Sequence, residues 1–111
     1  MLMRFKSTKL IAIHVTDLKK AERFYSGVLG FKLIQRTKKH LVYKTGTLIL
    51  YVSKDKKVLP FIPSLEVKDW KKAKAYLSQN GCRILKVFPK DKAFYFKDPF
   101  GIVLDVASTI K

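Results

Sequence analysis

The chain has 111 residues, which gives room for one domain, and its composition is that of a globular protein, with 48% hydrophobic and 13% aromatic residues. No apolar run approaches the roughly 20 residues needed to span a bilayer, and charged side chains interrupt the N-terminus, so we expect a cytoplasmic protein without membrane contact. The net charge is +16, from 24 Lys and Arg against 8 Asp and Glu, and such an excess favours anionic partners.

One sequence pattern occurs twice in the chain. Val15–Ala21 reads VTDLKKA, and Val67–Ala73 reads VKDWKKA. Each copy ends a short apolar run and opens a stretch with helical spacing, and each is followed by a glycine, Gly30 or Gly81. Repetition of a strand, helix and glycine in the same order predicts a tandem pair of one structural module.

The first half begins with a predicted strand at 10–15. Its side chains divide between two faces, because residues alternate along a strand: one face has Ile11, Ile13 and Val15, and the other has Leu10, Ala12 and His14. Asp17 is expected to cap a helix, whose predicted apolar stripe consists of Leu18, Ala21, Phe24, Tyr25 and Val28. After Gly30, which suits a helix end, we predict three strands, at 31–38, 40–45 and 47–53.

The second half repeats this order. Asp69 is expected to cap a helix with a stripe of Trp70, Ala73, Tyr76 and Leu77. We predict strands at 61–67, 82–88, 93–97 and 102–107, with a tight turn at 98–101. The chain is thus interpreted as a single domain over residues 1–111, with one module at 8–53, a linker at 54–60 and a second module at 61–108.

These motifs resemble those of the vicinal oxygen chelate superfamily, which includes glyoxalase I, extradiol dioxygenases and bleomycin-resistance proteins. The resemblance rests on 13–18 (IHVTDL), 24–25 (FY), 28–31 (VLGF) and 94–101 (FYFKDPFG). It implies an α+β, glyoxalase-like fold, in which two tandem β-α-β-β-β modules form a curled, barrel-like mixed sheet with helices outside. It also implies a homodimer, which in some members exchanges strands.

Enzymes of this superfamily hold a divalent metal with His, Glu or Gln side chains. Carried over position by position, the resemblance places these ligands at Leu10, Ile62, Leu50 and Asp105. A divalent ion needs at least three nitrogen, oxygen or sulfur donors, and the three aliphatic side chains supply none. We therefore expect no metal and no cofactor.

The remaining inference is a small-molecule site in the cavity that such folds form between modules or subunits. The expected apolar lining is Leu10, Ala12, Leu50, Ile62 and Val103, and the expected polar anchors are Asp105, His14, Ser64 and Glu66. A lone carboxylate such as Asp105 is weak evidence for catalysis. We therefore predict binding without catalysis, of a neutral or anionic compound, because the charge disfavours a cation such as bleomycin.

Two alternatives remain open. One is a glyoxalase-like or dioxygenase-like enzyme with a relocated metal site, built from Asp105, His14 and Glu66. The other is a basic module whose partner is a nucleic acid or an acidic protein. Of the other reactive side chains, His40 is predicted to be a solvated hairpin residue, and Cys82, the only cysteine, a core residue.

Overall fold

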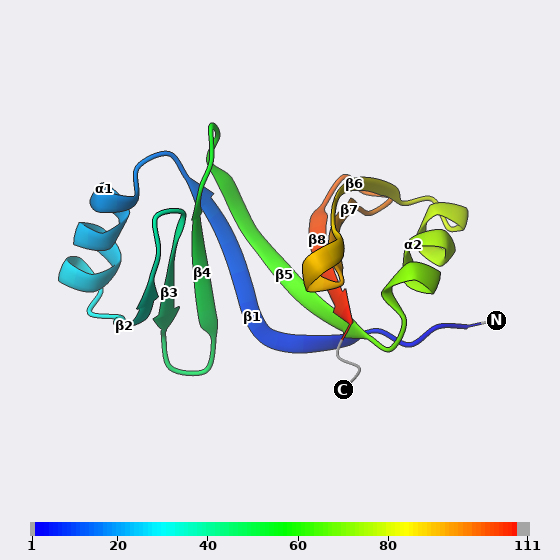
Figure 1. Ribbon diagram of the computed structural model, residues 1–111, viewed down its shortest axis with the longest axis horizontal. Helices are drawn as coiled ribbons and strands as arrows, with labels where there is room; N and C mark the ends of the chain where they lie inside the picture. Colours follow the sequence, from blue (N-terminus) through cyan, green and yellow to red (C-terminus); the bar gives the residue numbers. More distant parts are fainter. Residues whose placement is uncertain (1, 109–111) are drawn as a thin grey trace. The chain divides into compact units, whose positions relative to one another are not determined.

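The computed structural model describes residues 2–108 (Figure 1). The first module contains β1 (Lys6–Val15), α1 (Leu18–Glu22), the π-helix η1 (Arg23–Val28), β2 (Lys32–Arg36), β3 (His40–Lys44) and β4 (Ile49–Lys54). The second module contains β5 (Leu59–Val67), α2 (Trp70–Gln79), β6 (Arg83–Phe88), the 3-10 helix η2 (Pro89–Asp91), β7 (Ala93–Lys97) and β8 (Val103–Ser108). The predicted order of elements is therefore confirmed.

Both modules have the same strand topology. Each contributes four strands to a mixed sheet, in the order β2-β3-β4-β1 from the first module and β5-β8-β7-β6 from the second. In each module the first and last strands are parallel, and the remaining pairs are antiparallel. The α+β class and the tandem repetition predicted from the sequence are thus confirmed.

The chain divides into two compact units at residues close to the module boundary. Within the described residues, Lys9–Ile62 forms one unit, and residues 63–108 form the other together with residues 2–8. The connection between β4 and β5 is shorter than the predicted linker at 54–60, because β4 continues to Lys54 and β5 begins at Leu59. Among the described residues, no helix has the length and apolar character needed to cross a membrane.

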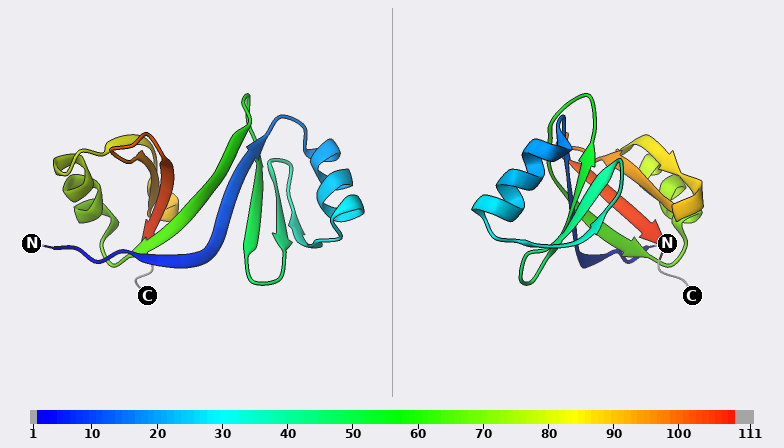
Figure 2. Two further views of the ribbon diagram at one scale, coloured as in Figure 1. Left: turned by 180° about the vertical axis from the view of Figure 1, so that it is seen from behind. Right: turned by 60° about the vertical axis from the view of Figure 1, so that its left-hand side comes forward.

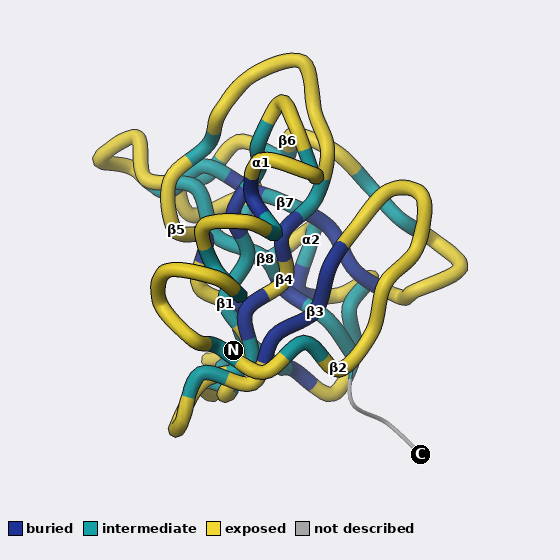
Figure 3. The backbone as a smooth tube through the Cα atoms, turned by 90° about the vertical axis from the view of Figure 1, so that its left-hand side faces the viewer, coloured by how far each residue is buried: buried dark blue, intermediate teal, exposed yellow. Residues whose placement is uncertain are grey.

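Each module has its own hydrophobic core between its helix and one face of its strands (Figure 2). The first core centres on Tyr43 and Val52, both 0% exposed, and the burial colours of Figure 3 show it as dark blue stretches of β3 and β4. The second core centres on Phe94 and Val106, also 0% exposed. Burying a side chain of this size contributes about 1.5–3 kcal/mol, so these two cores are the main source of stability in each module.

The helical segment of the first module departs from the predicted stripe. Leu18, Ala21 and Tyr25 pack against the core as expected, but Phe24 is 47% exposed and Val28 is 70% exposed. The cause is a change of winding: the amide of Leu29 donates to the carbonyl of Phe24, five residues earlier, which is the π-helical pattern. The wider turn rotates the later apolar side chains away from the core, so the prediction for Phe24 and Val28 is wrong.

The strands at the two ends of the strand order, β2 in the first module and β6 in the second, are each interrupted by a register shift at a corresponding place. The shift lies between Leu33 and Gln35 in β2, and between Ile84 and Lys86 in β6. In both strands one residue is left without a partner, which is the pattern of a β-bulge. The repetition therefore extends to irregular features of the backbone.

Candidate functional site

The predicted site residues of the second module lie on the sheet face opposite α2. Leu65, Phe94 and Val106 pack in the core with α2, and successive side chains of a strand point to opposite faces. Residues next to them on the other face pair across the strands, in the order Ser64 (β5), Asp105 (β8), Tyr95 (β7) and Lys86 (β6), which we call the Asp105 row. Sequence analysis identified Ser64 and Asp105 and missed the other two members.

Asp105 is held by a chain of hydrogen bonds. The Ser64 hydroxyl donates to Asp105 Oδ2 over 2.9 Å, and the Thr8 hydroxyl donates to the Ser64 carbonyl over 2.7 Å. Burial raises the pKa of the Asp105 carboxyl above its ordinary value, and the hydrogen bond from Ser64 opposes part of this rise. Asp105 is therefore protonated more easily than an exposed aspartate, and in that form it donates a hydrogen bond as well as accepting one.

The other end of the row is aromatic and basic. The rings of Tyr95 and Phe88 meet edge to face, with centroids 5.2 Å apart. The Lys86 amine lies 5.3 Å from the centre of the Phe88 ring, within cation–π range. The face thus combines a hydrogen-bonding pair, an aromatic surface and a positive charge.

The other candidates of the second module lie close to the row or along β5. Glu66 lies two residues after Ser64, and Val103 lies two residues before Asp105. Both are partly buried and occupy the same face as Ser64 and Asp105. Ile62 has 1% of its surface exposed. The structure therefore brings Ser64 and Asp105 into direct contact and places Glu66 and Val103 beside them.

In the first module, Leu10, Ala12 and His14 occupy the face of β1 opposite α1, as predicted, because the intervening residues pack in the core. The His14 ring is engaged within its own module. Its Nδ1 lies 2.8 Å from Oδ2 of Asp55, in the connection after β4. His14, which was predicted to anchor a ligand, therefore already has a carboxylate partner in Asp55.

The placement of Leu50 in the cavity lining is wrong. Leu50 is 4% exposed and belongs to the core beneath α1, on the opposite face of the sheet from Ala12. The sequence estimate counted four residues from the turn glycine in each module, but the turns differ in length. The amide of Thr45 closes the first turn on the carbonyl of Leu48, three residues on, and Asp98 closes the second on Ile102, four residues on.

Counting from the residue that closes the turn restores the correspondence. Tyr51 lies three residues after Leu48, as Asp105 lies three residues after Ile102, so Tyr51 is the counterpart of Asp105. The pairing partners give the whole corresponding row of the first module as Ala12, Tyr51, Val42 and Gln35. This row contains no acidic or basic side chain, so the two modules differ chemically on this face.

The comparison with known families decides the membership of the chain. The sequence profile of the Glyoxalase/Bleomycin resistance protein/Dioxygenase superfamily matches residues 8–106. The chain belongs to this superfamily. A search of functionally curated proteins gave no match.

Solved structures of the superfamily share the fold. A variant of homoprotocatechuate 2,3-dioxygenase from Brevibacterium fuscum gives a TM-score of 0.72 at 22% identity, covering 98% of this chain and 34% of the dioxygenase chain. The anaerobic complex of that dioxygenase with 3,4-dihydroxyphenylacetate gives a TM-score of 0.72 at 23% identity, covering 96% of this chain and 37% of the other. The superfamily member described here thus spans about a third of the length of these dioxygenases.

The superfamily's metal does not fit the side chains at the corresponding positions. With the corrected register these positions hold Leu10, Ile62, Tyr51 and Asp105, which offer one carboxylate and one phenol. A divalent ion requires three or more converging donors. Within residues 2–108, no group of three or more His, Cys, Asp or Glu side chains is arranged to hold a metal ion.

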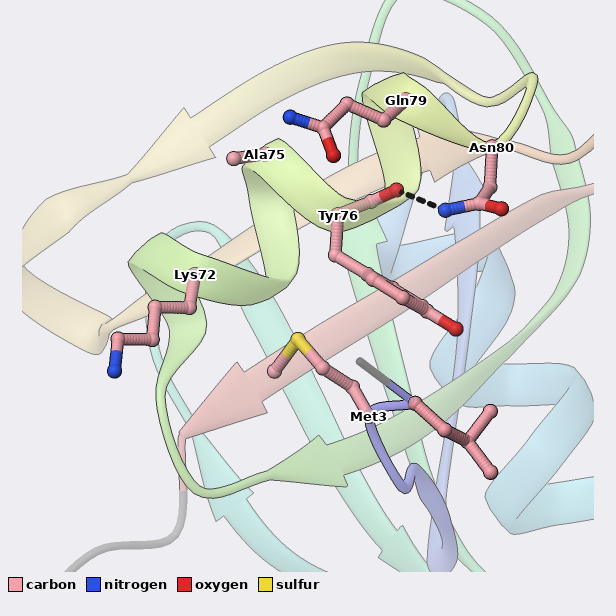
Figure 4. A pocket seen from close by; sticks show the side chains of 7 residues that line it. Met3, Lys72, Ala75, Tyr76, Gln79 and Asn80 are labelled. Atoms are coloured by element: carbon pink, nitrogen blue, oxygen red, sulfur yellow. Dashed lines mark hydrogen bonds between the residues drawn. The ribbon is translucent and has the colours of Figure 1, made fainter.

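A separate groove lies between α2 and the N-terminal segment (Figure 4). It has a volume of about 620 Å³ and is lined by Leu2, Met3, Lys72, Ala75, Tyr76, Gln79 and Asn80. The Tyr76 ring stacks on Phe5 with centroids 6.2 Å apart, and the Asn80 amide donates to the Tyr76 carbonyl over 2.8 Å. None of the predicted site residues lines this groove.

The two other reactive side chains agree with their predicted roles. Cys82 is partly buried against the second core, and burial raises the pKa of its thiol. A raised thiol pKa lowers the fraction of reactive thiolate at neutral pH. His40 is exposed at the start of β3, where its amide donates to the Thr37 hydroxyl over 3.0 Å.

Proposed function

We propose that this chain is a metal-free binding member of the superfamily, which holds a small neutral or anionic molecule against the Asp105 row without transforming it. The observation that carries this proposal is the hydrogen-bonded pair of Ser64 and Asp105 beside the aromatic surface of Tyr95. The pair offers donor and acceptor atoms, and the ring offers a surface for an apolar ligand.

The proposal that no metal takes part rests on the side chains at the ligand positions. Leu10 and Ile62 have no donor atoms, and the single carboxylate of Asp105 already accepts a hydrogen bond from Ser64. One carboxylate does not compensate the dehydration of a divalent ion. The neighbouring structures are dioxygenases, but at 22–23% identity they support the fold and not the activity of this chain.

The expected ligand is a small aromatic compound with a hydroxyl or carboxyl group. A protonated Asp105 donates to a ligand oxygen, and an ionised Asp105 accepts from a ligand hydroxyl. Lys86 lies at the other end of the row and favours a negative group there. A cationic ligand is disfavoured, because the chain carries a net charge of +16.

Native mass spectrometry tests the metal-free character. The untagged protein is measured before and after addition of Ni²⁺, Mn²⁺ and Zn²⁺, and we expect the mass of the polypeptide alone in each case. One metal ion per chain would overturn the metal-free proposal and favour the dioxygenase-like or glyoxalase-like alternative. Metal loss in Asp105→Ala would then place that ion at the Asp105 row.

Titration by ¹H–¹⁵N NMR tests the ligand site, with 3,4-dihydroxyphenylacetate as the anionic aromatic probe and catechol as the neutral one. We expect shift changes at the amides of Ser64, Tyr95 and Asp105, and at least about tenfold weaker binding in Asp105→Ala, or roughly 1.4 kcal/mol. The matched control is Asp69→Asn, which removes one carboxylate charge from the same module at the start of α2 and keeps a capping oxygen. Shift changes confined to other regions, or equal weakening by both variants, would count against the site.

The oligomeric state has its own measurement. We propose the homodimer that the superfamily resemblance predicts, and sedimentation velocity of the untagged protein distinguishes it from a monomer. A monomer at all concentrations would exclude a ligand site that needs two subunits, and would leave the Asp105 row of one chain to be tested as above.

A further inference from the structure

Positive charge gathers at one end of the first module. The connections from β1 to α1, from β2 to β3 and from β4 to β5 lie at this end, and the turn between β3 and β4 lies at the other (Figure 1). Two backbone hydrogen bonds join these connections: Lys54 donates to the Lys39 carbonyl, and Asp55 donates to the Val15 carbonyl, each over 2.8 Å. The backbones of all three connections are therefore held close together.

These connections enclose a groove of about 530 Å³. It is lined by Thr16, Asp17, Leu18, Lys19, Glu22, Arg36, Thr37, Lys38, Leu41 and Lys54, and we call it the basic groove. Three further lysines, Lys39, Lys56 and Lys57, belong to the same connections. The groove lies entirely within the first module, so it is distinct from the Asp105 row.

The acidic residues of the groove are already engaged. Both carboxylate oxygens of Glu22 accept from the Arg36 guanidinium, which holds the pKa of Glu22 below its usual value. The Asp17 carboxylate accepts from the amide of Lys20 as the cap of α1, and this bond lowers the pKa of Asp17. Neither carboxylate forms an ion pair with a lysine of the groove.

The lining of the basic groove carries a net charge of +2, because Lys19, Arg36, Lys38 and Lys54 exceed the two carboxylates of Asp17 and Glu22. Within residues 2–108, Arg36 is the one Lys or Arg side chain in an ion pair with a carboxylate. A bound anion offsets this excess of positive charge.

We propose that the basic groove binds a small phosphate-bearing compound. A phosphate group offers several strongly accepting oxygens, so it suits a groove lined by lysines from α1, from the connection between β2 and β3, and from the end of β4. A nucleic acid fits less well, because the lining of the groove includes no aromatic ring on which a base could stack. The groove and the Asp105 row are independent, so each proposal stands or falls alone.

Calorimetric titration with inorganic pyrophosphate tests the proposal at constant ionic strength. The groove variant is Lys38→Ala with Lys54→Ala, and the control is Lys32→Ala with Lys44→Ala. Lys32 and Lys44 pair with each other at the opposite end of β2 and β3, so both variants remove two exposed charges from the same module. We expect one saturable site in the parent, weakened at least about tenfold in the groove variant and less than about twofold in the control.

Three outcomes would overturn the proposal. Equal weakening in both variants would show attraction to overall charge, and a linear titration without saturation would show no site. Tighter binding of a ten-nucleotide single-stranded DNA, weakened equally by both variants, would favour a nucleic-acid surface instead. Circular dichroism of both variants confirms that the fold is retained.

Discussion

The two modules are alike on the side that faces the helix and different on the side that faces away. Beneath the helices, Val52 and Val106 occupy corresponding positions and are both fully buried. On the opposite faces, Tyr51 in the first module corresponds to Asp105 in the second. The two modules therefore share the apolar side chains of their cores, and they differ in the polar side chains of the opposite face.

The largest expected effects test the likeness of the two cores. Leu41 pairs with Val52 and Phe94 pairs with Val106, so Leu41→Ala and Phe94→Ala remove corresponding core side chains. Each leaves a cavity and should lower the free energy of unfolding, by about 2–5 kcal/mol for leucine and about 3–5 kcal/mol for phenylalanine. Urea denaturation measures both.

The control for this pair is Phe100→Ala, because Phe100 is 88% exposed. Removal of that ring should change stability by less than about 0.5 kcal/mol. A loss confined to one of the two core variants would show that one module does not depend on its helix-facing core, and the comparison would fail.

Smaller effects distinguish the two helices. Asp69 accepts from the amides of Lys71 and Lys72 and begins a ten-residue helix, whereas Asp17 accepts from Lys20 and begins a five-residue one. Replacement of a capping aspartate by alanine costs about 1 kcal/mol, and we expect Asp69→Ala to cost more than Asp17→Ala. Urea midpoints compare them, and Asp69→Asn, which keeps a capping oxygen, should recover most of the loss.

The smallest effect concerns the face where the modules differ. The pKa of Asp105 is raised in the folded state by burial, so the folded chain binds a proton more readily than the unfolded chain. The contribution of Asp105 to stability therefore increases as pH falls through its folded pKa, and this increase ends below the unfolded pKa.

Asp105→Asn removes this titration and keeps an oxygen that accepts from Ser64. Urea midpoints of parent and variant from pH 7 to pH 4 should therefore show the variant's advantage diminishing as pH falls. A constant difference across this range would mean that Asp105 is not desolvated as the structure indicates. Tyr51→Phe in the first module should show no such dependence on pH.

The sequence predicted more of the fold than of the site. The repeated motif predicted the order of elements along the chain in both modules, but not the order of the strands within the sheet. Leu50 was misplaced because a difference of one residue in turn length moves the following side chains to the opposite face of the sheet. Phe24 was misplaced because the spacing of apolar residues does not reveal a local change from α-helical to π-helical winding. Tyr95 could have been predicted from the sequence. The β7–β8 hairpin closes at Asp98 and Ile102, and pairing residues outward from this closure places Tyr95 opposite Asp105.

The bulges in β2 and β6 have a consequence for the protein at high concentration. Each lies in a strand that ends the hydrogen-bonding order, where unpaired amides and carbonyls would otherwise recruit a strand of another molecule. The irregular backbone and the lysine and arginine side chains of these strands oppose such edge-to-edge polymerisation. A chain with two exposed sheet edges is in this way protected against fibrous aggregation at both of them.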